Sequence, residues 1–225
     1  MTLCEVWSLG RVPYREGLAL QERLVAERAA GAPDRLLLLE HDPVFTLGSA
    51  ADAHNVLWDE AERARRGVEL VRIDRGGDVT YHGPGQMVAY PILQLPRQPG
   101  QMHANIVGYV RALERTLIAM LATYGIAARP IQGLTGVWVT TSNGDAKIAA
   151  IGVRVNVKAI TKHGLALNLN TDLSYFEGII PCGIRDKGVT SLAAMLGVPV
   201  DEAEARRRFV AAFAAEFGCE MVWVE

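Results

Sequence analysis

Apolar residues recur at intervals of three and four along three stretches of the chain, which is the spacing of one face of a helix. The first stretch is closed by Gly31 and Pro33, the second by Gly125, and the third starts after Pro199 with Asp201, a favourable N-cap. We therefore predict helices over Tyr14 to Ala30, His103 to Tyr124 and Asp201 to Phe217. A shorter helix is expected over Asp59 to Arg66.

Strand-like runs lie between these helices, and one of them alternates strictly, with Val153, Val155 and Val157 on one face. The predicted strands are Arg35 to Glu40, Glu69 to Ile73, Gln86 to Gln94, Val137 to Thr141, Lys147 to Val157 and Gly164 to Asn170, besides an apolar first strand around Cys4. Ser142 to Asp145 contains Asn-Gly and predicts a hairpin turn.

Strands joined by hairpins, with helices inserted singly, predict an α/β (α+β) fold with a mixed sheet that helices cover on one side. Neither a compositional break nor an internal repeat divides the sequence, so residues 1–225 are expected to form a single domain.

Composition narrows the possible partners. The formal net charge of −2, with scattered Lys and Arg, argues against a nucleic-acid or membrane-surface partner, since both require a concentrated basic surface. Three separated cysteines, Cys4, Cys182 and Cys219, do not resemble a secreted disulfide framework. The N-terminus lacks a signal-peptide pattern, and the run Leu36 to Leu39 is too short to cross a bilayer. A cytoplasmic protein is expected.

The most unusual segment is Arg75 to Gln86, RGGDVTYHGPGQ, which combines four glycines and a proline with Arg, Asp, Tyr, His and Gln. Glycines allow a backbone to approach a ligand closely, and bare N–H groups can bind an oxygen. A pair of tight turns between two strands explains the same composition. The segment lacks the Gly-Lys-Ser/Thr ending of a P-loop and the dinucleotide GxGxxG pattern.

Cys182 stands between Pro181 and Gly183, in a loop that a large substrate can reach, although most lone cysteines are inert apolar residues. A nucleophilic thiol needs a partner that favours its thiolate. Lys147, which opens an apolar strand, is one candidate base, and a strand-edge lysine that extends to water is the alternative. Cys4 and Cys219 are predicted to be structural residues without a catalytic role. The five histidines show no metal-ligand spacing, and no metal site is predicted.

Three blocks of the sequence together resemble the octanoyl-carrier-protein–protein octanoyltransferases, a branch of the biotin/lipoyl ligase-like superfamily. They are RGGDVTYHGPGQ from Arg75, KIAAIGVR from Lys147 with HGLALN from His163, and Pro181-Cys182-Gly183 with Val189-Thr190-Ser191-Leu192. Two earlier segments, LGRVPY from Leu9 and EHDPVFTLG from Glu40, are also similar to the family, so the resemblance covers nearly the whole chain. It implies a single ligase-like domain whose mixed, mostly antiparallel sheet is flanked by helices.

The resemblance implies a two-step transfer. Cys182 takes the octanoyl group from octanoyl-acyl carrier protein as a thioester, and a lysine of a lipoyl domain then removes it as an amide. Lys147 would pair with Cys182 and lower the pKa of its thiol. His82 would either orient the carbonyl group or build the pocket, and pocket-building is favoured. The residues implied to bind the acyl substrate are Arg75, Gly76, Gly77, Asp78, Val79, Thr80, Tyr81, His82, Ala150, Ile151, Gly152, Gly164, Leu165 and Ala166.

The implied acceptors are the lipoyl domains of 2-oxoacid dehydrogenase complexes and the glycine cleavage H protein, in the first step of lipoate cofactor synthesis. No cofactor is expected, because a thioester is already an activated acyl group. The alternatives are an ATP-dependent lipoate–protein ligase, a non-catalytic acyl-binding protein and a thioesterase. The Pro-Cys-Gly loop and the short chain argue against the ligase, and the lack of a GRGRxGR-like run argues against a biotin ligase.

Overall fold

A computed structural model describes residues 2–97, 104–181 and 187–224. Its α-helices are α1 (Tyr14–Ala29), α2 (Glu60–Arg65), α3 (Ile106–Ala122), α4 (Leu192–Leu196) and α5 (Glu202–Phe217). Asp59, Asn105, Ser191 and Asp201 cap the starts of α2, α3, α4 and α5 with side-chain oxygens that accept a backbone N–H. The three long helices and the short one predicted from periodicity are confirmed.

The strands of the larger sheet are β1 (Thr2–Arg11), β2 (Asp34–Glu40), β6 (Gln86–Ile92), β7 (Ala128–Ile131), β8 (Leu134–Thr141), β9 (Gly144–Val155), β10 (Thr161–Asn168), β11 (Gly188–Val189) and β12 (Cys219–Val224). They lie in the order β12-β1-β2-β6-β10-β9-β8-β7, with β11 beside β9. Pairing is parallel from β12 to β2 and antiparallel from β2 to β7, which confirms a mixed, mostly antiparallel sheet.

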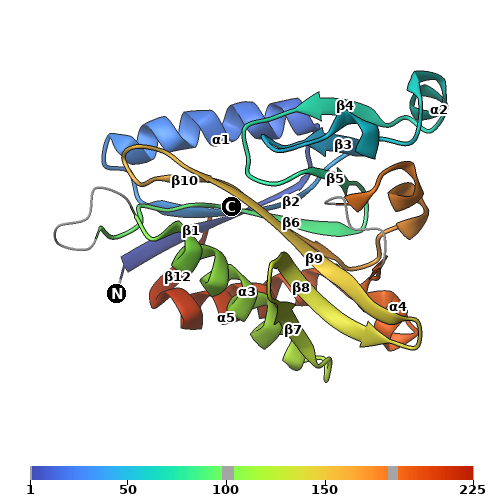
Figure 1. Ribbon diagram of the computed structural model, residues 1–225. Coiled ribbons are helices and arrows are strands. Elements are labelled where there is room, and N and C mark those ends of the chain that lie inside the picture. Colours follow the sequence, from blue (N-terminus) through green and yellow to red (C-terminus); the bar gives the residue numbers. More distant parts are fainter. Residues whose placement is uncertain (1, 98–103, 182–186, 225) are drawn as a thin grey trace.

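A smaller sheet, in the order β4-β3-β5, lies over one end of the larger one (Figure 1). Its strands are β3 (Val44–Leu47), β4 (Glu69–Arg72) and β5 (Val79–His82). Strands β3 and β5, and also β7, β11 and β12 of the larger sheet, were not predicted, and β5 was hidden because it lies inside the glycine-rich segment. That segment is therefore a loop, Arg75 to Asp78, followed by a strand.

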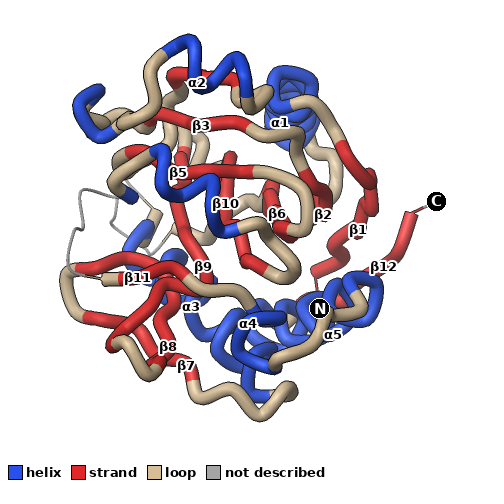
Figure 2. Tube along the Cα trace, turned by 90° about the vertical axis from the view of Figure 1, so that its right-hand side faces the viewer, coloured by secondary structure: helices blue, strands red, loops and turns tan. Residues whose placement is uncertain are grey.

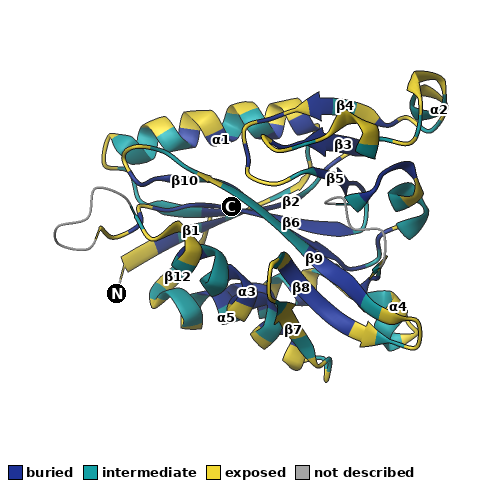
Figure 3. Ribbon diagram, in the orientation of Figure 1, coloured by how far each residue is buried: buried dark blue, intermediate teal, exposed yellow. Residues whose placement is uncertain are grey.

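Helices cover both faces of the larger sheet, so the expectation of cover on one side is wrong (Figures 1 and 2). Leu36 and Leu38 of β2 pack with residues of α3 and α5, whereas Leu37 and Leu39 pack with Leu24 of α1. The run of four leucines shows no polar alternation because neither face of β2 meets water. Figure 3 shows the central strands buried between exposed outer helix surfaces.

The remaining segments agree with the sequence in most respects. The predicted hairpin joins β8 to β9, with Gly144 at a φ of +100°, which favours glycine. Cys4 is a buried residue of β1, and Cys219 opens β12 directly after α5. Within the described residues, no helix combines the length and apolar character needed to span a membrane.

Candidate active site

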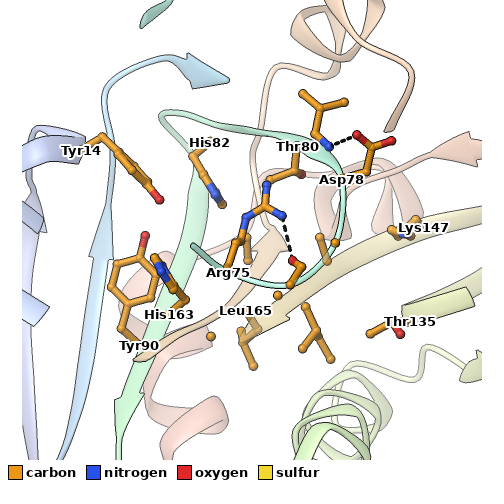
Figure 4. Close-up of a pocket in the computed structure, with 18 residues that line it drawn as sticks. Tyr14, Arg75, Asp78, Thr80, His82, Tyr90, Thr135, Lys147, His163 and Leu165 are labelled. Carbon is orange, nitrogen blue, oxygen red and sulfur yellow. Dashed lines mark hydrogen bonds between the residues drawn. The ribbon is translucent and has the colours of Figure 1, made fainter. Parts of the chain in front are cut away.

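A cavity opens between the two sheets, lined by the glycine-rich loop, by β5, and by β9 and β10 of the larger sheet (Figure 4). Thirteen of the fourteen residues expected to bind substrate line it, and Lys147 lines it too. The exception is Tyr81, whose ring lies on the side of β5 away from the cavity. Thr80 and His82 line the cavity, whereas Tyr81 stacks on Tyr175 in a separate apolar cluster, with ring centroids 5.0 Å apart.

Lys147 reaches the cavity because of a bulge between β8 and β9. Trp138 of β8 pairs with Lys147, but the residue before it, Val137, pairs with Ala149, so Ile148 is the extra residue on β9. Ile148 and Ala149 both belong to the core beside α3 and α5, and Lys147 and Ala150 both line the cavity. Strict alternation would put Lys147 and Ala150 on opposite faces.

Glycine at position 136 is required by this same bulge. Its φ is +124°, and a Cβ there would come within 2.6 Å of the Ala149 carbonyl oxygen. The backbone N–H of Gly136 donates to Oε1 of Glu114, a buried carboxylate of α3, at 3.2 Å. The helix thereby supports the strand segment that faces Lys147.

Trp138 lies directly beside Lys147. The ammonium nitrogen of Lys147 is 4.8 Å from the centroid of the Trp138 ring, and both side chains are buried. The indole N–H of Trp138 donates to the Leu134 carbonyl oxygen at 3.1 Å, which fixes the ring. The face of an aromatic ring attracts a cation, so this contact restricts the position of the amine.

The polar side chains of the glycine-rich loop hold the loop in place. Nη2 of Arg75, which is buried, donates to the backbone oxygen and to the hydroxyl of Thr46 in β3, at 2.7 and 2.8 Å. The Asp78 carboxylate accepts from the backbone N–H of Val79 at 2.7 Å and from the Asn55 side chain at 2.5 Å. The loop therefore covers the cavity as an ordered wall.

A cluster of rings closes the cavity on the side away from Lys147, formed by Tyr14, His82, Tyr90 and His163 (Figure 4). Tyr14 stacks with His82, with centroids 6.0 Å apart. His41 lies behind this cluster, and its Nε2 is 2.7 Å from the Tyr90 hydroxyl. His82 Nδ1 is 2.8 Å from Gln86 Oε1. These contacts hold the His82 ring in the wall of the cavity.

The histidines around the cavity are neutral at pH 7. Burial lowers the pKa of His82 to about 3 and those of His41 and His163 to about 4. His163 Nε2 is 2.8 Å from Oδ1 of Asp74, and this contact opposes the shift without cancelling it. Burial also raises the pKa values of Tyr14 and Tyr90, so both hydroxyls keep their protons.

A second, smaller cavity shares Lys147, Thr80, Ala150 and Ala166 with the first. Pro181, the residue that precedes Cys182 in the sequence, also lines it. Cys182 itself lies outside the described residues. Lys147 is thus at the junction of two cavities, one closed by rings and one lined by Pro181.

Four lining residues were missed as site residues: Tyr14, Tyr90, Thr135 and His163. His163 belongs to a quoted sequence block, but nothing in its pattern reveals that its backbone adopts a φ of +59°. Tyr90 lies on the same face of β6 as Val88 and Ile92, which predicts its face but not the cavity. Among the described residues, no group of three or more His, Cys, Asp or Glu side chains is arranged to hold a metal.

Comparison with known proteins identifies the family. Residues 13–214 match the family model of the lipoyl protein ligase A/B catalytic domain. An octanoyltransferase of Chloroflexus aggregans is 49% identical over 219 residues, or 96% of each chain. The mitochondrial octanoyltransferase LIP2 of Arabidopsis thaliana is 51% identical over 190 residues, which cover 84% of this chain and 77% of that one.

The fold has solved counterparts. The structure of a bipartite lipoate protein ligase of Thermoplasma acidophilum aligns with a TM-score of 0.78 at 18% identity, over all of this chain and 88% of that chain. This likeness concerns the fold alone, whereas the identity to the two octanoyltransferases extends over most of the sequence. The chain therefore belongs to the octanoyltransferase family, within the lipoyl protein ligase A/B catalytic-domain group.

Proposed function

We propose that this protein transfers an octanoyl group from octanoyl-acyl carrier protein to the lysine of a lipoyl domain, through a thioester on Cys182. The observation that carries the proposal is the buried Lys147 at the junction of two cavities, one of which includes the neighbour of Cys182. Thirteen residues expected to bind the acyl chain line the other cavity. Membership in the octanoyltransferase family supports the octanoyl group as the cargo.

In the first step, the Cys182 thiolate attacks the thioester carbonyl carbon of the donor. A carbon–sulfur bond to Cys182 forms, the bond to the carrier thiol breaks, and the ammonium group of Lys147 protonates the leaving thiolate. The Trp138 ring beside Lys147 holds the amine in position for this proton transfer. The products are the acyl-enzyme, neutral Lys147 and the free carrier thiol.

In the second step, the ε-amine of the lipoyl-domain lysine attacks the Cys182 thioester. A carbon–nitrogen bond forms, neutral Lys147 accepts the amine proton, and the Cys182 thiolate leaves. The thiolate and ammonium pair is restored. Neither step needs ATP, because a thioester is an activated acyl group and its aminolysis is downhill.

The proposed acceptors are the lipoyl domains of 2-oxoacid dehydrogenase complexes and the glycine cleavage H protein. A nucleophilic thiolate persists in a reducing compartment, which supports a cytoplasmic setting. The acyl group occupies the cavity, with its carbonyl carbon near Lys147 and its tail toward the ring cluster.

The test is a transfer assay with purified protein, octanoyl-acyl carrier protein and a lipoyl domain, with ATP omitted. Octanoylation of the lipoyl domain under these conditions, detected by intact mass, is the expected result. Modification that requires ATP and free octanoate would instead identify a ligase. A protein that binds octanoyl donors without transferring the group would be an acyl-binding protein, and release of free octanoate would identify a thioesterase.

Trp138 offers a test of how Lys147 is held. Replacing Trp138 with leucine removes the ring under the ammonium group and is expected to lower kcat about 5- to 30-fold, since a desolvated cation–π contact is worth about 1–2 kcal/mol. KM for the donor should change little, because Trp138 does not line the cavity. Trp138→Phe retains a ring and should recover part of the rate. Equal rates for the leucine and phenylalanine variants would show that the ring has no such role.

A further inference from the structure

We propose that Tyr14, Tyr90 and His163 form the floor of the acyl cavity and limit the acyl chain to about eight carbons. This inference rests on the proposed function. It assigns the selection of chain length to three side chains, which come from α1, β6 and β10. None of the three was among the residues that the family resemblance implied to bind the acyl substrate.

The floor lies opposite the reacting end of the cavity. Tyr14, Tyr90 and His163 all line the cavity, and each is at most 3% exposed. In Figure 4 their rings lie on one side of Arg75 and Lys147 lies on the other, and the Tyr14 and Tyr90 hydroxyls point toward each other. An acyl chain with its carbonyl carbon near Lys147 must run toward these rings.

The length of β9 sets the depth of the cavity. The cavity runs along this strand from Lys147 to Gly152, and Gly152 pairs with Gly164, the neighbour of His163. That stretch spans at most about 16 Å at the usual rise of a strand. An extended eight-carbon chain is about 9 Å long from its carbonyl carbon to its methyl group, given ordinary bond lengths.

Hydrogen bonds hold the floor side chains in place, so that a longer acyl chain cannot easily displace them. His41 Nε2 lies 2.7 Å from the Tyr90 hydroxyl, and His41 Nδ1 lies 2.7 Å from the Val12 carbonyl oxygen. The ring of His41 also packs on Tyr14, with centroids 4.8 Å apart. Displacing Tyr90 would leave buried polar groups without partners, which is costly in an apolar interior.

His163 is fixed by its backbone as well as by its side chain. Its φ of +59° is a left-handed conformation that a residue other than glycine adopts only at a cost. Its backbone N–H donates to Gln21 Oε1 at 2.7 Å, and its Nε2 lies 2.8 Å from Asp74 Oδ1. Such strain in a buried residue that lines the cavity indicates that the position of this ring matters.

Replacing a floor side chain with a shorter one should therefore allow the cavity to bind a longer acyl chain. Each methylene that gains a buried site improves transfer about fourfold. Tyr14→Leu is expected to raise the ratio of decanoyl to octanoyl transfer about 15-fold, measured as kcat/KM with decanoyl- and octanoyl-acyl carrier protein. His163→Gly should shift the ratio in the same direction, and glycine suits the left-handed backbone at this position.

Tyr109→Leu is the matched control. Tyr109 is as buried as Tyr14, but it belongs to the core between the sheet and α3. A thermal unfolding curve verifies that each variant is folded, and the control should keep the parent ratio. The proposal is overturned if both floor variants fold and transfer octanoyl groups with the parent ratio, or if Tyr109→Leu shifts the ratio equally. Failure of the parent protein to transfer any octanoyl group would instead overturn the proposed function.

Discussion

Replacing Lys147 with methionine is expected to lower octanoyl transfer by about 10² to 10⁴-fold, the usual contribution of a positioned general acid and base. Methionine retains the apolar length that packs near Gly136 but can neither protonate the leaving carrier thiol nor accept the proton of the incoming amine. Because both steps use the same amine, the loss should appear in kcat as well as in kcat/KM. The rate of lipoyl-domain octanoylation at saturating donor measures it.

Lys162→Met is the matched control for this loss. Lys162 is also largely buried, with a side chain that is 13% exposed, and it lies on the neighbouring strand β10. It does not line the cavity with Lys147 and pairs with Glu22 and Asp74. The control should transfer octanoyl groups within a few-fold of the parent rate. A Lys147→Met protein that is folded and retains most of its activity would rule out the proposed proton transfers.

A second large effect is expected on stability in acid. His41, His82 and His163 are buried, and their folded-state pKa values are about 4, 3 and 4, against about 6.5 for an exposed histidine. As the pH falls below 6.5, the unfolded chain binds protons at these imidazoles, whereas the folded protein does not until the pH approaches 4. The free energy of unfolding therefore falls with decreasing pH across this window and levels off above about pH 7.

The expected loss is about 4 to 6 kcal/mol between pH 7 and pH 5, if the three histidines act independently. Chemical unfolding at a series of pH values measures it. His82→Asn should reduce the steepest slope by up to about 1.4 kcal/mol per pH unit, because one linked proton is lost. His54→Asn is the control, since the His54 side chain is 95% exposed. A free energy of unfolding that does not change between pH 7 and pH 5 would contradict the neutral, buried state of the three rings.

Much of the fold follows from local sequence patterns, and the exceptions have physical causes. The long helices were predictable because their apolar faces repeat and because Asp201 is a favourable cap for the third, whereas the cap of the second, Asn105, was not foreseen. That helices cover both faces of the larger sheet could not be predicted, since the leucines of β2 show no alternation that would separate one face from the other. The short strand β5 was obscured because its pattern is embedded among glycines.

The site divides in a similar way. Residues of the glycine-rich segment and of β9 and β10 could be grouped from the sequence because the family resemblance associates these blocks. Tyr14 ends the quoted LGRVPY segment, but nothing in that segment showed that it lines the cavity, and Tyr90 lies in no quoted block; both reach the cavity through the packing of α1 and β6. The Trp138–Lys147 contact depends on a one-residue bulge, and a shift of register by one residue reverses the face of every side chain beyond it.

The central claim is the acyl-enzyme on Cys182, and an intact mass measurement tests it most directly. The protein is mixed with octanoyl-acyl carrier protein alone, without ATP or lipoyl domain. The covalent mechanism predicts a gain of one octanoyl group, absent in Cys182→Ser and discharged when a lipoyl domain is added. Transfer to the lipoyl domain with no adduct on the parent protein, or an undiminished adduct on Cys182→Ser, would contradict it.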